Sequence, residues 1–117
     1  MYCAGFPNPP ATPTLVQGNA NIIQIQWAKP SSNGGSSVLG YFLYMKAQTD
    51  AQYTLIYNGA ENPNDVTFET TTDQNGNPLI PLTNYLFMVS ARNIVGTSTN
   101  SDALSVSIPY LLSTTAT

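Results

Sequence analysis

Charge of either sign is scarce in this chain of 117 residues. Only 8% of the residues are charged, three of them Lys or Arg and six Asp or Glu, and the formal net charge is −3 at pH 7. Proteins that bind nucleic acid neutralise phosphate groups with clustered Lys and Arg side chains. Lys29, Lys46 and Arg92 lie far apart in the sequence and cannot form such a cluster. We therefore expect no nucleic-acid partner.

Histidine is absent, and cysteine occurs once, as Cys3. Histidine is the commonest general base and metal ligand, and one cysteine cannot form an internal disulfide or a cysteine zinc site. Cys3 matches no lipidation motif and is expected to be a free thiol, with an intermolecular disulfide as the alternative. The acids fall mostly in expected loops; they are Asp50, Glu61, Asp65, Glu69, Asp73 and Asp102. We expect no catalytic site, metal or cofactor, and hence no enzyme.

Long apolar runs are missing as well. No run approaches the roughly 18 residues that cross a bilayer, and Met1–Pro7 lacks the basic and apolar regions of a signal peptide. This segment is therefore not expected to insert into a membrane. The apolar fraction of 42% is ordinary for a globular domain, and the length suits one such domain. We expect the chain to be a piece of a longer multidomain protein.

Alternation of apolar and polar residues is the strongest structural signal present. In Asn21–Trp27, the side chains of Ile23, Ile25 and Trp27 share one face, with glutamines between them, the pattern of a half-buried strand. Turn sequences such as Asn33–Ser36 separate further short segments with β propensity. These segments are Thr14–Gln17, Leu39–Ala47, Tyr53–Tyr57, Val66–Thr71, Asn84–Asn93 and Ala103–Ile108. Seven strands and no helical pattern predict an antiparallel β-sandwich.

Two motifs are more specific. Residues 79–98 read L-x-P-x-T-x-Y-x-F-x-V-x-A-x-N-x-x-G-x-S, and Trp27 is followed by Pro30, Gly34-Gly35 and Gly40-Tyr41-Phe42-Leu43. Both closely resemble signatures of the fibronectin type III family, over about residues 8 to 109. The resemblance implies an all-β fold, a seven-stranded antiparallel immunoglobulin-like β-sandwich of fibronectin type III topology. Residues 1–7 would then be an N-terminal lead-in and residues 110–117 a C-terminal linker.

The signature residues also have physical reasons to be what they are. Tyr85 is similar to the tyrosine-corner residue of such sandwiches, with a buried ring and a hydroxyl bonded to backbone upstream. Leu79 would pack beneath that corner, and Pro81 would stiffen the turn. We expect Trp27 to fill the core and Gly96 to supply a turn conformation. The structural signature comprises Trp27, Tyr41, Leu79, Pro81, Tyr85 and Gly96.

One loop, Asp73–Asn77, places oxygen-bearing side chains at alternate positions, as a calcium-binding loop does. The match is poor, because Asp73 is its only acid and no bidentate Glu follows at the required distance. We interpret this segment as a plain Asn-Gly turn.

One surface stands out as a candidate site for protein contact. If Tyr41 points inward, strand alternation sends Phe42 and Tyr44 outward, and the same rule sends Leu86 and Met88 outward on an adjacent strand of the resembled fold. The candidate protein-contact face therefore comprises Phe42, Tyr44, Leu86 and Met88, with Ala103, Ser105 and Ser107 as a small-residue margin. Large apolar patches often mark contact surfaces, but sandwich sheets also carry a few solvent-facing hydrophobic residues. Both interpretations stay open.

The predicted function is that of a non-catalytic module, a spacer and protein-interaction or adhesion domain of a larger, extracellular or cell-surface protein. An intracellular setting stays open, because intracellular relatives of this fold exist. The alternatives are an accessory module of a secreted carbohydrate-active enzyme, and a dedicated ligand-binding domain that uses the candidate face. The expected partners are another protein or neighbouring domains of the same chain. A small-molecule ligand is not expected.

Overall fold

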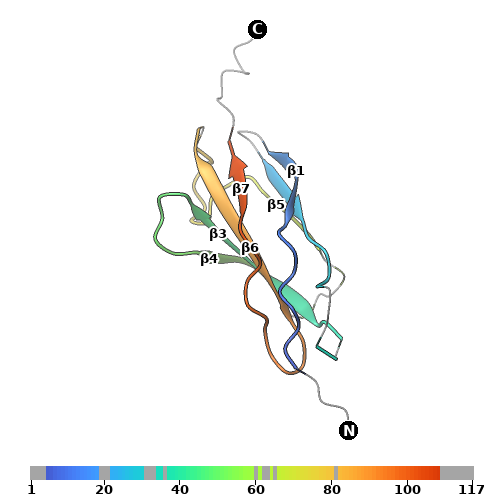
Figure 1. Cartoon of the computed structure of the whole chain (residues 1–117). Coiled ribbons are helices and arrows are strands. Elements are labelled where there is room, and N and C mark those ends of the chain that lie inside the picture. The colour runs from blue at the N-terminus through green and yellow to red at the C-terminus, as the bar shows by residue number, and fades with distance from the viewer. Residues whose placement is uncertain are drawn as a thin grey trace.

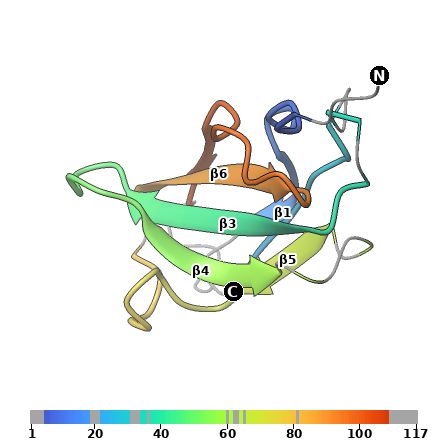
Figure 2. The ribbon, with the colours of Figure 1, turned by 90° about the horizontal axis from the view of Figure 1, so that it is seen from below.

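The computed structural model describes residues 5–18, 22–30, 34–35, 37–59, 61, 64, 66–80 and 82–108. Its strands are β1 (Thr14–Gly18), β2 (Ile23–Gln26), β3 (Gly40–Ala47), β4 (Thr54–Gly59), β5 (Thr67–Thr70), β6 (Asn84–Arg92) and β7 (Leu104–Ser107). They form a three-stranded sheet in the order β1-β2-β5 and a four-stranded sheet in the order β4-β3-β6-β7 (Figures 1 and 2). The predicted all-β sandwich is confirmed, and each predicted strand lies within two residues of an observed one.

The core lies between the two sheets and consists of the inward side chains of the strands. Trp27 is one of its buried residues, with its ring 5.9 Å from that of Tyr41 in an edge-to-face arrangement and 6.2 Å from that of Tyr57. Such pairs add about 0.5–1.5 kcal/mol to the stabilisation from burial. The buried apolar side chains are Ile23, Ile25, Trp27, Tyr41, Leu43, Met45, Leu79, Tyr85, Phe87, Val89, Ala91, Val106 and Ile108.

The corner at the start of β6 has the geometry expected of Tyr85. Its ring is buried, and its hydroxyl accepts a hydrogen bond of 3.0 Å from the backbone N–H of Ile80. Leu79 is buried beside it. Pro81, the third residue predicted for this corner, lies outside the described residues. In the loop before the corner, Asp73 accepts hydrogen bonds from the backbone N–H groups of Asn75 and Asn77, as in a side-chain-stabilised turn.

The expectation for Gly96 is wrong in its reason. Among the described residues, positive φ occurs at Leu82 and at glycines 34, 35 and 76, and not at Gly96. A side chain at Gly96 would instead collide with the ring of Phe6, since a Cβ atom built there lies 2.5 Å from a ring carbon. At this position an aromatic ring packs directly on the backbone, and a larger residue would displace that ring.

One side chain on the outward face of β6 is buried. Ser90 alternates with Met88 and so points to the same side of the sheet, but it is only 1% exposed. Phe42 lies directly opposite Ser90 on β3, and an aromatic ring at cross-strand distance is large enough to cover a serine. The Ser90 hydroxyl has no hydrogen-bond partner among the described residues.

The segment that precedes β7 pairs with β6 through serine hydroxyls. The backbone N–H groups of Ser98 and Ser101 donate to the carbonyls of Ala91 and Val89. In return, the hydroxyl of Ser98 accepts from the N–H of Ala91 at 3.0 Å, and that of Ser101 accepts from the N–H of Val89 at 3.1 Å. These hydroxyls replace carbonyl acceptors where the regular ladder between β6 and β7 ends.

The described chain begins and ends at opposite ends of the sandwich (Figure 1). Gly5 lies at one end, beside the loop that follows β6, and Ile108 lies at the other, beside the loop that precedes β6. Part of the expected lead-in is held on the domain, because Pro7 is buried and Gly5 is hydrogen-bonded to Gly34. The remaining lead-in and the linker 110–117 lie outside the described residues.

Candidate protein-contact face

The four candidate residues lie on the outward face of neighbouring strands in the four-stranded sheet. Tyr44 on β3 lies directly opposite Met88 on β6, and Leu86 lies opposite Lys46 one pair further along. Phe42 lies opposite Ser90. All four side chains are half-buried, whereas strand alternation alone predicts that they are exposed to solvent. We call this surface the outer face.

One exposed apolar residue of the outer face was missed from the sequence. Leu55 on β4 lies opposite Tyr44 and is 44% exposed. Simple alternation groups Leu55 with Tyr57, whose ring packs inward against Trp27. The register between β3 and β4 shifts at this point, so that the partners of Leu43 and Tyr44 are Tyr57 and Leu55. This bulge turns Leu55 to the outside, and no sequence signal indicates it.

The charged groups at the two ends of the outer face are already engaged. The ammonium group of Lys46 lies 5.2 Å from the centre of the Tyr53 ring and donates to the backbone carbonyl of Asp50. At the other end, Arg92 pairs with Glu61 at 3.0 Å. Glu61 is largely exposed, so this ion pair contributes at most about 1 kcal/mol to stability. The arrangement is an apolar centre between two polar ends.

The margin along β7 is polar and small, as expected. Ser105 lies opposite Leu86, and Ser107 lies opposite Asn84. Asn84 accepts from the Ser107 hydroxyl and donates to the side chain of Gln48. Ala103 is exposed just before β7 begins. An apolar centre with a polar rim is the usual anatomy of a protein–protein interface.

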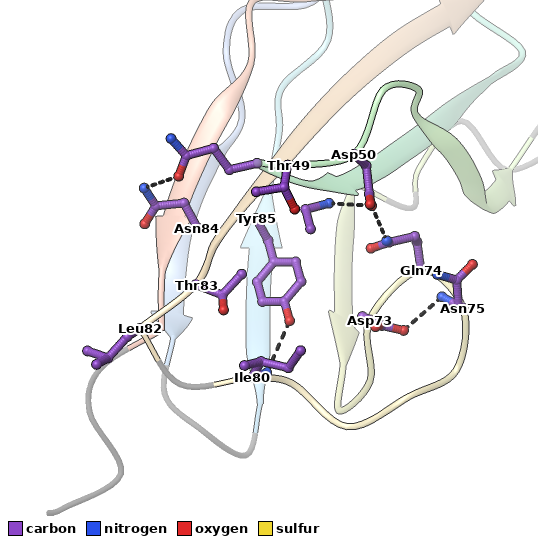
Figure 3. Close-up of a pocket in the computed structure, with 12 residues that line it drawn as sticks. Thr49, Asp50, Asp73, Gln74, Asn75, Ile80, Leu82, Thr83, Asn84 and Tyr85 are labelled. Atoms are coloured by element: carbon purple, nitrogen blue, oxygen red, sulfur yellow. Dashed lines mark hydrogen bonds between the residues drawn. The ribbon is translucent and has the colours of Figure 1, made fainter.

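A second feature is a hollow at the end of the sandwich where the loop before β6 lies (Figure 3). Its volume is about 360 Å³, and its lining includes Asp50, Asp73, Ile80, Leu82 and Tyr85. We call it the trailing hollow.

The two carboxylates of the trailing hollow hold loops together. Asp50 accepts from the backbone N–H of Ala47 and from the side-chain amide of Gln74. Asp73 accepts from the backbone N–H groups of Asn75 and Asn77. Neither carboxylate pairs with the other, as a catalytic dyad would. In the part of the chain that the structure describes, no three acids or cysteines gather as a metal site requires.

No helix long and apolar enough to cross a bilayer occurs in the described ranges.

Comparison with known proteins gives a consistent picture. The family model of the fibronectin type III domain matches residues 8–107. The chain is 30% identical to titin of Drosophila melanogaster over 93 residues, 79% of the chain. It is 33% identical to human slow-type myosin-binding protein C over 48 residues, 41% of the chain. A solved human FNIII domain superimposes with a TM-score of 0.75 at 23% identity, covering 95% of this chain and 86% of that one.

The chain corresponds to a small part of these curated relatives. It spans 4% of myosin-binding protein C and a share of titin that rounds to 0%. The match to each therefore concerns one segment of a much longer protein.

Proposed function

The chain belongs to the fibronectin type III domain family, and from this we propose that it is a non-catalytic structural module that binds protein through its outer face. The relatives support the first part, since the matched segments are small parts of long proteins. The described chain begins and ends at opposite ends of the sandwich (Figure 1), which suits a module joined in series.

The observation that carries the second part is an apolar row across three strands. The register sets Leu55, Tyr44 and Met88 side by side on β4, β3 and β6. Phe42 and Leu86 flank this row, each at the next outward-facing residue pair of β3 and β6, in opposite directions along the strands. The described side chains leave this row uncovered by any further layer of the fold, and its ends are closed by Lys46 and Arg92. A flat apolar row with a polar rim fits another folded protein better than it fits a small ligand.

The test uses the 117-residue chain, labelled with 15N and titrated with the modules that adjoin it in its full-length protein. We expect shifts of backbone amide resonances in β3 and β6. Replacing both Phe42→Ser and Met88→Ser should weaken binding about tenfold or more, because truncated apolar anchors at interface centres typically cost this much.

Two further variants make this result interpretable. Val16→Ser changes an equally apolar side chain, 48% exposed, on the opposite sheet, and it should leave binding unchanged. Leu55→Ser probes the outer face at a more exposed position, where the fold is less at risk. Shifts confined to the loops, or equal affinities for the outer-face variants and Val16→Ser, contradict a contact at this face.

Whether the module works outside or inside the cell stays a prediction. One relative is named for binding myosin, and neither relative supports the extracellular and adhesive role expected from composition. No observation on the described residues favours an accessory module of a carbohydrate-active enzyme or a dedicated ligand-binding domain.

A further inference from the structure

The turn that precedes the Tyr85 corner contains an asparagine followed by a glycine, and this dipeptide occurs three times in the chain. The three copies are Asn33-Gly34, Asn58-Gly59 and Asn75-Gly76. Asparagine is chemically reactive before glycine, because the backbone nitrogen of the glycine can attack the side-chain carbonyl carbon and no side chain obstructs its approach. The sequence alone presents the three dipeptides as equivalent, and the structure distinguishes them.

The reaction exchanges ammonia for water and needs no oxidant or reductant. The backbone nitrogen of the glycine loses its proton and forms a bond to the side-chain carbonyl carbon, and the amide group of the asparagine leaves as ammonia. The product is a cyclic succinimide. Water then breaks one of the two bonds between the ring nitrogen and a carbonyl carbon. Cleavage at the side-chain carbonyl gives aspartate, and cleavage at the backbone carbonyl gives isoaspartate, in which the main chain runs through the side chain.

The dipeptide Asn58-Gly59 lies in β4, where the fold opposes ring closure. Its residues pair with Phe42 and Tyr41 of β3, and an extended backbone holds the nitrogen of the next residue away from the side-chain carbonyl carbon. Gly59 is also buried, and the ring of Tyr57 lies so close that a Cβ atom built on Gly59 would be 2.5 Å from a ring carbon. Reaction at Asn58 therefore requires β4 to leave the sheet.

The glycine of Asn33-Gly34 is enclosed by the first described residues of the chain. A Cβ atom built on Gly34 would collide with the backbone carbonyl groups of Gly5 and Phe6. The carbonyl of Gly34 also accepts a hydrogen bond of 2.8 Å from the N–H of Gly5. The nitrogen of Gly34 therefore has little room to move. Asn33 itself lies outside the described residues.

The dipeptide Asn75-Gly76 is open by comparison. Both residues are exposed, and a Cβ atom built on Gly76 would meet nothing within 4 Å. The N–H of Gly76 donates to the carbonyl of Asp73 at 3.1 Å, a turn bond at the surface rather than a bond within a sheet. Breaking this bond releases the attacking nitrogen without unfolding a strand, and water can reach the ring that forms.

Isoaspartate at this position would disrupt the hydrogen bonds that close the turn. It adds one carbon atom to the main chain between residues 75 and 76. Three hydrogen bonds span this point. The N–H of Gly76 donates to the carbonyl of Asp73, the N–H of Asp73 donates to the carbonyl of Asn77 at 2.7 Å, and the N–H of Asn77 donates to the Asp73 carboxylate at 2.9 Å. A longer main chain does not fit all three bonds at once.

The same turn supports one wall of the trailing hollow. The side-chain amide of Gln74, between Asp73 and Asn75, donates to the carboxylate of Asp50 (Figure 3). This bond joins the turn to the loop that follows β3, and both loops line the hollow. A turn that loses its closing bonds no longer holds Gln74 against Asp50.

We propose that Asn75 is a deamidation site, and that its conversion to isoaspartate releases Gln74 from Asp50 and loosens the wall of the trailing hollow. Because ammonia is lost, modified molecules accumulate with time. One end of the sandwich therefore differs between newly made and aged molecules. The proposal does not rest on the outer face.

The test incubates the 117-residue chain at mildly alkaline pH and follows deamidation at each Asn-Gly dipeptide by peptide mass spectrometry. Because reaction in a strand requires local opening of the fold, Asn75 should react about tenfold or more faster than Asn58. It should also react faster than Asn33. In urea that unfolds the chain, the three rates should become similar.

Two results overturn the assignment of this site. One is a rate at Asn58 or Asn33 of the folded chain that equals or exceeds the rate at Asn75. The other is a preference for Asn75 that persists unchanged in urea, because the fold would then not be its cause. Asn75→Gln is the control variant, since glutamine keeps the amide but must close a larger ring. It should abolish the reaction at position 75 and leave that at Asn58 unchanged.

A second measurement tests the release of Gln74. The isoaspartate form is purified by chromatography and compared with Asn75→Asp, which adds the same charge without lengthening the main chain. In the isoaspartate form, hydrogen exchange at the N–H of Asn77 should quicken and the side-chain amide resonances of Gln74 should shift. Both should stay close to those of the unmodified chain in Asn75→Asp. An isoaspartate form without these changes, or equal changes in Asn75→Asp, overturns the proposed release.

Discussion

At the scale of single residues, the core contains two tyrosines in contrasting situations. Tyr85 accepts a hydrogen bond from Ile80, whereas the hydroxyl of Tyr41 is buried without a hydrogen-bond partner among the described residues. A satisfied buried hydroxyl contributes to stability, and an unsatisfied one detracts from it. The same hydroxyl group is therefore favourable at one position and unfavourable at the other.

Replacing each tyrosine by phenylalanine should reveal this difference. Tyr85→Phe leaves the N–H of Ile80 without its acceptor and should lower the free energy of unfolding by about 1–3 kcal/mol. Tyr41→Phe removes an unpaired hydroxyl and should leave stability unchanged or raise it by about 1 kcal/mol. Urea denaturation of both variants measures the difference. Equal losses in the two would show that the Tyr41 hydroxyl has a partner.

At the scale of elements, the edge of β6 depends on two serine side chains. Ser98 and Ser101 supply acceptors to backbone N–H groups of buried residues Ala91 and Val89. In an ordinary ladder, a carbonyl would do this. The segment between β6 and β7 is therefore held to β6 partly by serine hydroxyls, at the place where the backbone pairing is irregular.

Ser98→Ala and Ser101→Ala should each lower the free energy of unfolding by about 1–3 kcal/mol, since each leaves a buried N–H unpaired. Hydrogen exchange should quicken at Ala91 in the first variant and at Val89 in the second. Thr99→Ala, at an exposed position between them, should change stability by less than about 0.5 kcal/mol. A Thr99→Ala loss as large as the serine losses would point to a disturbed loop rather than to lost acceptors.

At the scale of the whole molecule, the free energy of unfolding depends on pH in the alkaline range, because two tyrosines are shielded from water in the fold. Burial raises the pKa of Tyr41 and of Tyr53 above the ordinary value of 10.0, because the charged phenolate is poorly solvated there. The unfolded chain loses these protons first. The stability associated with the neutral tyrosines is therefore fully present below pH 10.0 and falls as pH rises towards the pKa values of the folded module.

Thermal unfolding followed at increasing pH should show a melting temperature that falls above pH 10.0. In Tyr41→Phe, the melting temperature should fall less steeply with pH. Tyr53 should account for part of the remaining fall. A melting temperature of Tyr41→Phe that falls as steeply as that of the unchanged chain would rule out Tyr41 as a source.

By itself, the sequence determined which segments become strands and which faces turn inward. Alternation of apolar and polar side chains is a local property with a period of two, so Ile23, Ile25 and Tyr41 could be placed in the core without coordinates. The motif from Leu79 to Ser98 likewise indicated the corner at Tyr85.

Only the tertiary structure decided the rest of the surface. The bulge beside Tyr57 turns Leu55 outward, Ser90 is buried opposite Phe42, and the ring of Phe6 lies against Gly96. Each of these contacts joins residues far apart in the chain or shifts a register by one residue, and neither effect leaves a periodic signal. The trailing hollow arises in the same way, because the loops that line it come from distant parts of the sequence. Local patterns therefore predicted the core and four residues of the outer face, and long-range packing decided the rest of the candidate sites.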